Sequence, residues 1–215
     1  MSADKDAKRT AATTHSKAAA HVPMSSTVSF AFYTGLGASE PLINRLTALI
    51  SGRFMHVEIV FPAAGASGAA GEHLACGVWA GEKTFMRKKR FGKSCWVWKS
   101  ISVTEAQKEA MRKFCALQAR RKVPFSRMAM MRAVTPFPRA TDGRTWFCSE
   151  LCVAAMQAGG LLLDEVAAAC TPSDVHELLL SLRAYSSASP VVEDRIAANK
   201  LRCGSKWFRR AGGGR

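Results

Sequence analysis

Residues 145–160 have the sequence TWFCSELCVAAMQAGG, and this stretch decides the expected fold. Its apolar periodicity begins at Leu151 and a polar turn at residues 142–144 precedes it, so Cys148 falls in the first turn of a helix. The two glycines that close the stretch end that helix. A first helical turn carries free backbone N–H groups that can stabilise a thiolate and later an oxyanion. Cys148 is therefore a candidate nucleophile, although a cysteine in this position is more often a small buried residue.

A strand is expected over residues 55–61, where apolar side chains alternate with His56 and Glu58. The two-residue spacing places both polar side chains on one face of the strand. A neutral imidazole there can take a proton from a thiol, and a carboxylate beside it can orient the ring. The alternative is an ordinary histidine on a solvent-facing strand surface.

The remaining periodic segments indicate an α+β domain. Strands are expected at residues 28–32, 74–80 and 94–101, with helices at residues 39–52, 104–121 and 171–183. Thr104 with Gln107 forms a capping box at the start of the second of these helices. The strands on either side of the basic turn at residues 83–93 predict an antiparallel meander. Residues 123–144 predict a long loop that lines an apolar surface.

The length of 215 residues fits one domain with two tails. We expect a disordered basic arm at residues 1–26, a folded domain at residues 27–185 and a basic flexible tail at residues 186–215. The formal net charge of +15 indicates attraction to an anionic partner such as nucleic acid, an anionic membrane surface or an acidic protein. No apolar run approaches the roughly 20 residues that cross a bilayer, and no secretory signal is present, so a cytoplasmic location is expected.

Cysteine usage gives no sign of a disulfide framework. The chain has seven cysteines, an odd number, and none lies in a CxxC pair. Cys148 and Cys152 are four residues apart and in principle could bind a metal, but no further ligand pair lies nearby in sequence. We expect reduced thiols, no metal and no cofactor.

Three segments together resemble the permuted papain-like enzymes of the NlpC superfamily: HVEI at residues 56–59, FCSEL at residues 147–151 and TPS at residues 171–173. The resemblance is to the YiiX-like hydrolases and related proteins of large DNA viruses, with lecithin retinol acyltransferase a more distant relative. In this group the strand histidine precedes the helix cysteine, as here. The resemblance implies a permuted papain-like (NlpC-like) α+β fold, an antiparallel β-sheet or barrel of five or six strands packed against helices.

The resemblance also implies roles for individual residues. Cys148 would be the nucleophile and His56 the general base, with acyl-thioester chemistry on an amide or ester. Glu58 is the expected orienting residue, and Glu72 or Glu82 takes that role if it comes from a neighbouring strand. Tyr33 is a candidate oxyanion donor or a packing residue.

Positive charge gathers around the expected basic turn and in the C-terminal tail, and both are candidate anion-binding surfaces (Lys83, Arg87, Lys88, Lys89, Arg90, Lys93, Arg209 and Arg210). Aromatic residues flank the turn, so it could hold phosphates and stack bases or dock on anionic lipid head groups. A solvated hairpin turn is the plainer alternative.

The sequence therefore predicts a cysteine-dependent hydrolase or acyltransferase whose acyl-containing substrate is a lipid or is peptide-like. The alternative is a non-catalytic basic virion or structural protein that binds nucleic acid or another anionic partner. In a virus, either protein would be virion-associated.

Overall fold

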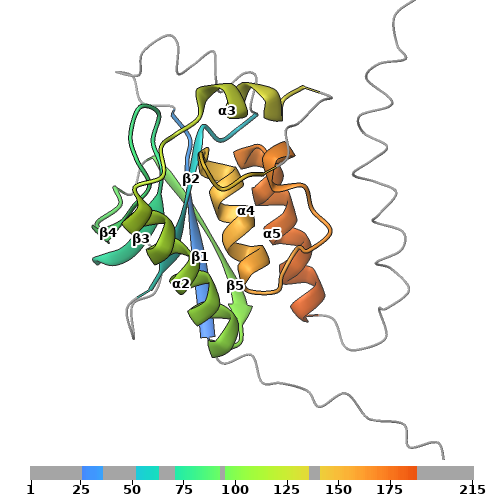
Figure 1. The fold of residues 1–215 in the computed structure, drawn as a ribbon. Helices are drawn as coiled ribbons and strands as arrows, with labels where there is room; N and C mark the ends of the chain where they lie inside the picture. The colour runs from blue at the N-terminus through green and yellow to red at the C-terminus, as the bar shows by residue number, and fades with distance from the viewer. Residues whose placement is uncertain (1–25, 36–51, 63–70, 93–94, 136–140, 188–215) are drawn as a thin grey trace, which may run out of the picture.

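The computed structural model describes residues 26–35, 52–62, 71–92, 95–135 and 141–187, with side chains described as far as residue 182. The elements in chain order are β1 (Ser26–Tyr33), β2 (His56–Phe61), β3 (His73–Gly77), β4 (Phe85–Lys89), β5 (Trp96–Val103), α2 (Glu105–Arg121), α3 (Arg127–Ala133), α4 (Cys148–Ala158), the 3-10 turn η1 (Ala167–Ala169) and α5 (Pro172–Ser187). Figure 1 shows their arrangement.

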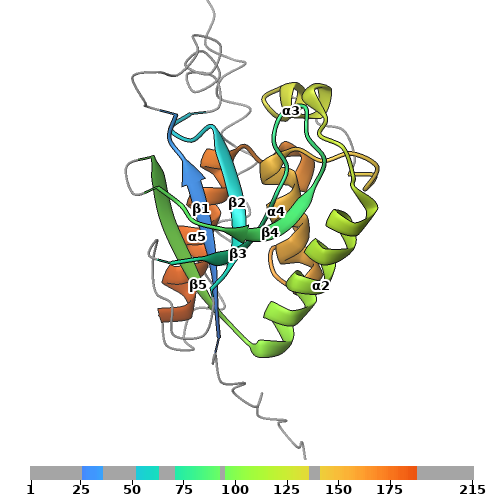
Figure 2. The same ribbon diagram turned by 90° about the vertical axis from the view of Figure 1, so that its left-hand side faces the viewer.

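The strands form one five-stranded sheet in the order β4-β3-β2-β1-β5, and every neighbouring pair is antiparallel. The simple meander expected from the sequence is wrong at β5, which pairs with β1 along its whole length instead of lying beside β4. β4 itself lies inside the segment expected to be only a basic turn, because residues 85–89 pair with β3 from Gly77↔Phe85 to His73↔Lys89. Figure 2 shows β3 and β4 lying across β1 and β2.

The main core lies between one face of this sheet and the helices. Alternate residues of β1 and β2, such as Phe30 and Ile59, pack there against Met111 of α2, Leu151 of α4 and Leu179 of α5, all at most 1% exposed. The opposite face carries a smaller cluster of buried residues, Ala31, Val60, Ala75 and Phe91, with Trp96 and Trp98 packed on it. His56 and Glu58 alternate with the residues of the main core, as the strand pattern predicted.

The helices agree with the sequence patterns except in one place. Thr104 caps α2, and both hydrogen bonds of the predicted capping box with Gln107 are present. The expected loop at residues 123–144 contains α3, which begins after Ser126 because its hydroxyl accepts a hydrogen bond from Ala129 N. Thr171 and Asp174 exchange hydrogen bonds at the start of α5.

The chain therefore belongs to the α+β class, with a five-stranded antiparallel sheet and helices packed on one face. Ser26 begins β1, one residue before the expected start of the domain. The helix expected at residues 39–52 falls almost wholly outside the described residues, as do Lys93, Arg209 and Arg210. Among the described helices, none combines the length and apolar character needed to span a bilayer.

Candidate active site

His56 and Glu58 lie side by side at the start of β2 and are both buried. Their side chains are 5% and 0% exposed, and His56 Nε2 lies 3.3 Å from Glu58 Oε1. The alternative of a histidine on a solvent-facing surface is wrong, because the β3–β4 hairpin and its aromatic residues cover this face. A base and an orienting carboxylate thus lie in contact inside the protein.

Cys148 is the first residue of α4, and its thiol interacts with the His56 imidazole. Phe147 is the N-cap residue and offers no side-chain cap, so the N–H groups of the first turn are not used by a capping side chain. α4 is held against β2 farther along, where the Cys152 thiol donates to Val57 O at 3.9 Å. The His56 ring thus contacts the Glu58 carboxylate through Nε2 and also forms a hydrogen bond with the Cys148 thiol.

The electrostatics of this contact favour a thiolate and an imidazolium. Burial alone would lower the pKa of His56, but the charge and hydrogen bond of Cys148, and then those of Glu58, raise it to about 9. Burial would raise the pKa of Cys148, but the charge and hydrogen bond of His56 lower it below its ordinary value, with backbone hydrogen bonds from Val57 and Ser149 adding to the effect. The two groups thus stabilise each other's charged forms.

The second thiol of α4 has the opposite behaviour. Burial, then the charge of Cys148, holds the pKa of Cys152 well above its ordinary value. Cys115 of α2 is also buried and its pKa is raised, first by burial and then by contact with Cys76. Cys148 therefore differs from these two buried cysteines in having a base beside it.

Glu58 accepts three hydrogen bonds on one oxygen. His56 Nε2 lies 3.3 Å from Oε1, Trp79 Nε1 donates to it at 3.0 Å and Lys89 Nζ donates at 2.7 Å. Burial would raise the pKa of Glu58, but the hydrogen bond and charge of His56, and then the charge of Lys89, lower it. The carboxylate is thus held ionised although it is fully buried.

Aromatic rings enclose the imidazole. Trp79 stacks on His56 with ring centroids 3.7 Å apart and an interplanar angle of 24°. Tyr33 pairs with His56 across β1 and β2, and its ring packs on Trp79 at 5.9 Å and on Trp96 at 5.2 Å. Tyr33 therefore lies among the aromatic rings around His56. Its role as an oxyanion donor stays a prediction.

Contacts from distant parts of the chain fix the two ends of the site. Phe147 packs on Ala129 and Ala133 of α3, and Ser126 N donates to Trp146 O at 2.8 Å. Figure 1 shows α3 lying over one end of α4. The buried carboxylate of Glu150 in α4 is also held in place, because Thr141 Oγ1 donates a hydrogen bond to its Oε1 at 3.1 Å.

Neither alternative to Glu58 lies beside His56. Glu72 is 48% exposed and its carboxylate lies 3.9 Å from Lys88 Nζ. Glu82 is exposed, and its backbone carbonyl accepts from Phe125 N. The arrangement brings Cys148, His56 and Glu58 together and leaves these two glutamates outside.

The basic residues of the hairpin separate into two groups. Lys83, Arg87, Lys88 and Arg90 are exposed, whereas Lys89 turns inward to Glu58. Sequence reasoning missed the part that Lys89 and Trp79 play at the site. Local sequence gives little indication of this role, because Lys89 and Trp79 are far from Glu58 in sequence. Strand pairing in the sheet brings both donors to β2.

Among the described residues, no three His, Cys, Asp or Glu side chains are grouped so that they could hold a metal ion. Comparison of the chain with protein-family models, with curated proteins and with solved structures found no match.

Proposed function

We propose that the protein is a cysteine-dependent hydrolase or acyltransferase that acts on an amide or ester. The observation that carries this proposal is the contact of Cys148 with His56, whose ring also contacts the buried carboxylate of Glu58. A nucleophile, a base and an orienting group in contact are the arrangement that thiol catalysis needs. The same residues, with the antiparallel sheet and the helix that begins at the cysteine, support a permuted papain-like fold.

In the proposed reaction the Cys148 thiolate attacks the carbonyl carbon, and the carbonyl π electrons move to the oxygen. Backbone N–H groups at the start of α4, including that of Ser149, would hold this oxyanion. The His56 imidazolium gives its proton to the leaving amine or alcohol as the C–N or C–O bond breaks, which leaves an acyl thioester on Cys148. Water or an acceptor alcohol or amine then attacks the thioester, His56 takes its proton, and the thiolate is regenerated.

Exposed apolar side chains on α3 support an acyl group with apolar character. α3, which packs on Phe147, exposes the side chains of Met128 and Met131, which are 63% and 62% exposed. Methionine side chains adapt to flexible apolar ligands. A lipid amide or ester, or a peptide-like amide with an apolar acyl side, is the proposed substrate class.

The proposal is tested by labelling the full chain with limiting iodoacetamide across pH 5–9 and locating the label by mass spectrometry. Cys148 should react at lower pH than Cys152 and Cys115, and His56→Ala should remove that advantage. Cys152→Ala, a change one helical turn away, is the matched control and should leave the labelling of Cys148 unchanged. Acyl transfer is then measured with a panel of esters and amides on the wild type and on Cys148→Ala. A Cys148 no more reactive than Cys152 would overturn the proposal.

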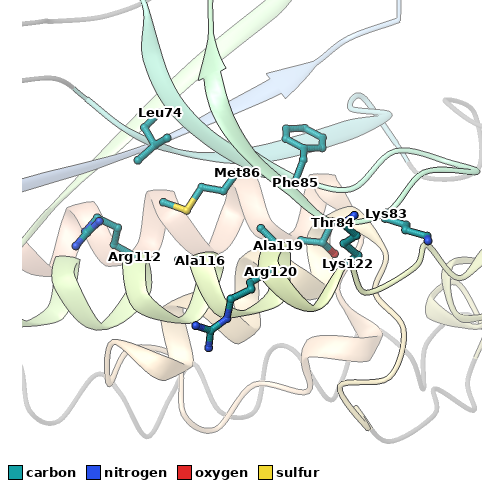
Figure 3. A pocket seen from close by; sticks show the side chains of 10 residues that line it. All are labelled: Leu74, Lys83, Thr84, Phe85, Met86, Arg112, Ala116, Ala119, Arg120 and Lys122. Atoms are coloured by element: carbon teal, nitrogen blue, oxygen red, sulfur yellow. The ribbon is translucent and has the colours of Figure 1, made fainter.

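A second candidate function rests on a separate feature, which we call the basic groove. It has a volume of about 650 Å³ and lies between α2 and the β3–β4 hairpin, with an apolar floor and a basic rim (Leu74, Lys83, Thr84, Phe85, Met86, Arg112, Ala116, Ala119, Arg120 and Lys122). Figure 3 shows these side chains. Its lining includes none of Cys148, His56 and Glu58, so anion binding there would be independent of catalysis.

This second candidate, a basic protein that holds nucleic acid or another anionic partner, is tested by the salt dependence of binding. A nucleic-acid ligand should dissociate steeply as salt rises, and Arg120→Ser with Lys122→Ser should reduce the slope. Cys148→Ala should bind like the wild type. Binding that is insensitive to salt and to both substitutions would exclude the basic groove as the binding surface.

A further inference from the structure

Lys89 differs from the other basic residues of the β3–β4 hairpin in what it contacts. Its Nζ lies 2.7 Å from Glu58 Oε1, and its side chain is 21% exposed. The preceding residue, Lys88, is 78% exposed and lies 3.9 Å from a carboxylate that is itself 48% exposed. Lys88 therefore makes a surface ion pair of the kind that contributes little, whereas Lys89 pairs with a fully buried carboxylate.

Three aromatic rings surround the ammonium group of Lys89. Its Nζ lies 5.5 Å from the ring centroid of Trp79, 4.7 Å from that of Phe91 and 4.6 Å from that of Trp96. Cation–π attraction to these rings adds to the ion pair and limits the positions that the ammonium can take. The rings thus hold Lys89 in place against Glu58.

The same rings connect Lys89 to the imidazole. Trp79 stacks on His56 and donates its indole N–H to the oxygen that also accepts from Lys89. Glu58 Oε1 therefore accepts hydrogen bonds from Lys89 of β4 and from Trp79. These two donors hold the carboxylate oxygen beside His56. Without Lys89, the buried Glu58 carboxylate would keep only His56 as a cationic partner among the described residues.

We propose that Lys89 is a positioning residue of the site, which holds the Glu58 carboxylate against His56 and moderates the negative charge that Glu58 presents to the imidazole. This inference rests on the proposed function where it concerns catalysis, but its electrostatic part concerns His56 alone. It also removes Lys89 from the candidate anion-binding residues, because its charge is already used inside the protein.

The charged and titratable groups around Glu58 determine the direction of the expected effects. His56 lies beside it on β2, Lys89 comes from β4, and Cys148 and Cys152 come from α4. Removing the positive charge of Lys89 makes this group of residues more negative, so both His56 and Cys148 hold their protons more tightly. The pH range of the thiolate–imidazolium pair should therefore move upward.

The test compares Lys89→Met, Lys89→Arg and the matched control Lys88→Met in the full chain. The titration of His56 is followed by NMR of ring-labelled histidine, with the signal assigned by its loss in His56→Gln. Lys89→Met should raise the midpoint of the His56 titration by more than about half a pH unit. Lys89→Arg and Lys88→Met should leave it near the wild-type value. An unchanged midpoint in Lys89→Met would overturn the proposal whatever the activity of the protein.

The second readout is the pH profile of Cys148 alkylation. In Lys89→Met the acidic limb should move to higher pH by about half a pH unit or more, because Cys148 holds its proton more tightly once the positive charge of Lys89 is gone. A purely structural role would lower the unfolding temperature and leave the position of the acidic limb unchanged, which would also overturn the proposal. If Cys148 is inert in the wild type while the His56 midpoint still shifts, the proposed function fails and the electrostatic link between Lys89 and His56 stands.

A double substitution keeps the test decisive where Lys89→Met, which leaves a buried carboxylate without its lysine partner, does not fold. Glu58→Gln with Lys89→Met leaves neither member of the pair buried and unpaired. Against Glu58→Gln alone, the added Lys89→Met change should move the His56 midpoint by less than half of the shift that Lys89→Met causes in the wild type. If Lys89→Met itself does not fold, the comparison of Glu58→Gln with Glu58→Gln plus Lys89→Met stands alone, because neither of these variants buries an unpaired carboxylate. A shift of more than about half a pH unit between these two would show that Lys89 acts on His56 without Glu58 and would overturn the positioning role.

Discussion

Gly77 of β3 lies directly against the side chain of Glu58 of β2. A Cβ atom at position 77 would lie 2.9 Å from Glu58 Cγ and 3.2 Å from Phe85 Cζ. These distances leave no room for a methyl group unless one of the two side chains moves. The glycine therefore provides the space in which the buried carboxylate reaches His56 and Lys89.

Gly77→Ala should displace Glu58 and slow Cys148 alkylation at neutral pH by about tenfold or more, because the carboxylate no longer orients the imidazole. Crowding of a fully packed site should also cost about 1–3 kcal/mol of unfolding free energy. The measurements are alkylation rate and chemical denaturation. Gly92→Ala is the control, because a Cβ at position 92 would meet no atom within 4 Å. Equal rates for Gly77→Ala and Gly92→Ala would contradict the role given to Gly77.

The pH dependence of acyl transfer should differ from that of alkylation. Acyl transfer needs the Cys148 thiolate and the His56 imidazolium together, so its rate should fall on the alkaline side as His56 loses its proton near pH 9. Alkylation needs only the thiolate, whose pKa is lowered, so its rate should rise at acidic pH and stay high above pH 9. Both profiles are measured on the same preparation. An acyl-transfer rate that keeps rising through pH 10 would contradict the assignment of His56 as the acid.

Local sequence patterns were enough to predict where His56, Glu58 and Cys148 lie within their own strand and helix. The alternation around His56 and Glu58 predicted a strand with both side chains on one face, and the polar turn before residue 148 predicted a helix with Cys148 in its first turn. Each inference needs only a few neighbouring residues and a fixed period. The contact between His56 and Cys148 needs long-range packing, and only the resemblance to a family anticipated it.

Two parts of the fold could not be predicted in the same way. β4 is only partly buried and carries Arg87, Lys88 and Lys89, so it lacks the apolar alternation that marks a strand, and it forms because its backbone pairs with β3. α3 has only seven residues and lies in a segment with three prolines, where composition favours a loop. The pairing of Lys89 with Glu58 depends on the order of strands, which local sequence does not determine.

Trp79 offers a substitution that separates its hydrogen bond from its ring. Trp79→Phe keeps an aromatic ring against His56 but removes the N–H that donates to Glu58 Oε1 at 3.0 Å. We expect acyl transfer and Cys148 alkylation to slow by about three- to tenfold, the effect of one lost hydrogen bond of about 1 kcal/mol. Trp96→Phe is the control, because Trp96 contacts His56 only through its ring, at 6.3 Å between centroids. If the two variants slow the reaction equally, the indole N–H of Trp79 has no special part.

The exposed methionines of α3 should affect the choice of acyl chain. Met128 and Met131 are more than half exposed on the helix that packs against Phe147, next to the nucleophile. Replacing both by serine removes apolar surface that a long acyl chain could cover, so KM for long-chain esters should rise about tenfold while kcat and the rate with short esters stay unchanged. Leu163→Ser is the control, because Leu163 is 69% exposed but lies in the loop after α4. Since neither methionine is buried, the double variant should unfold at the wild-type temperature. An unchanged KM for every chain length would remove α3 from the acyl-binding surface and leave the chemistry at Cys148 unaffected.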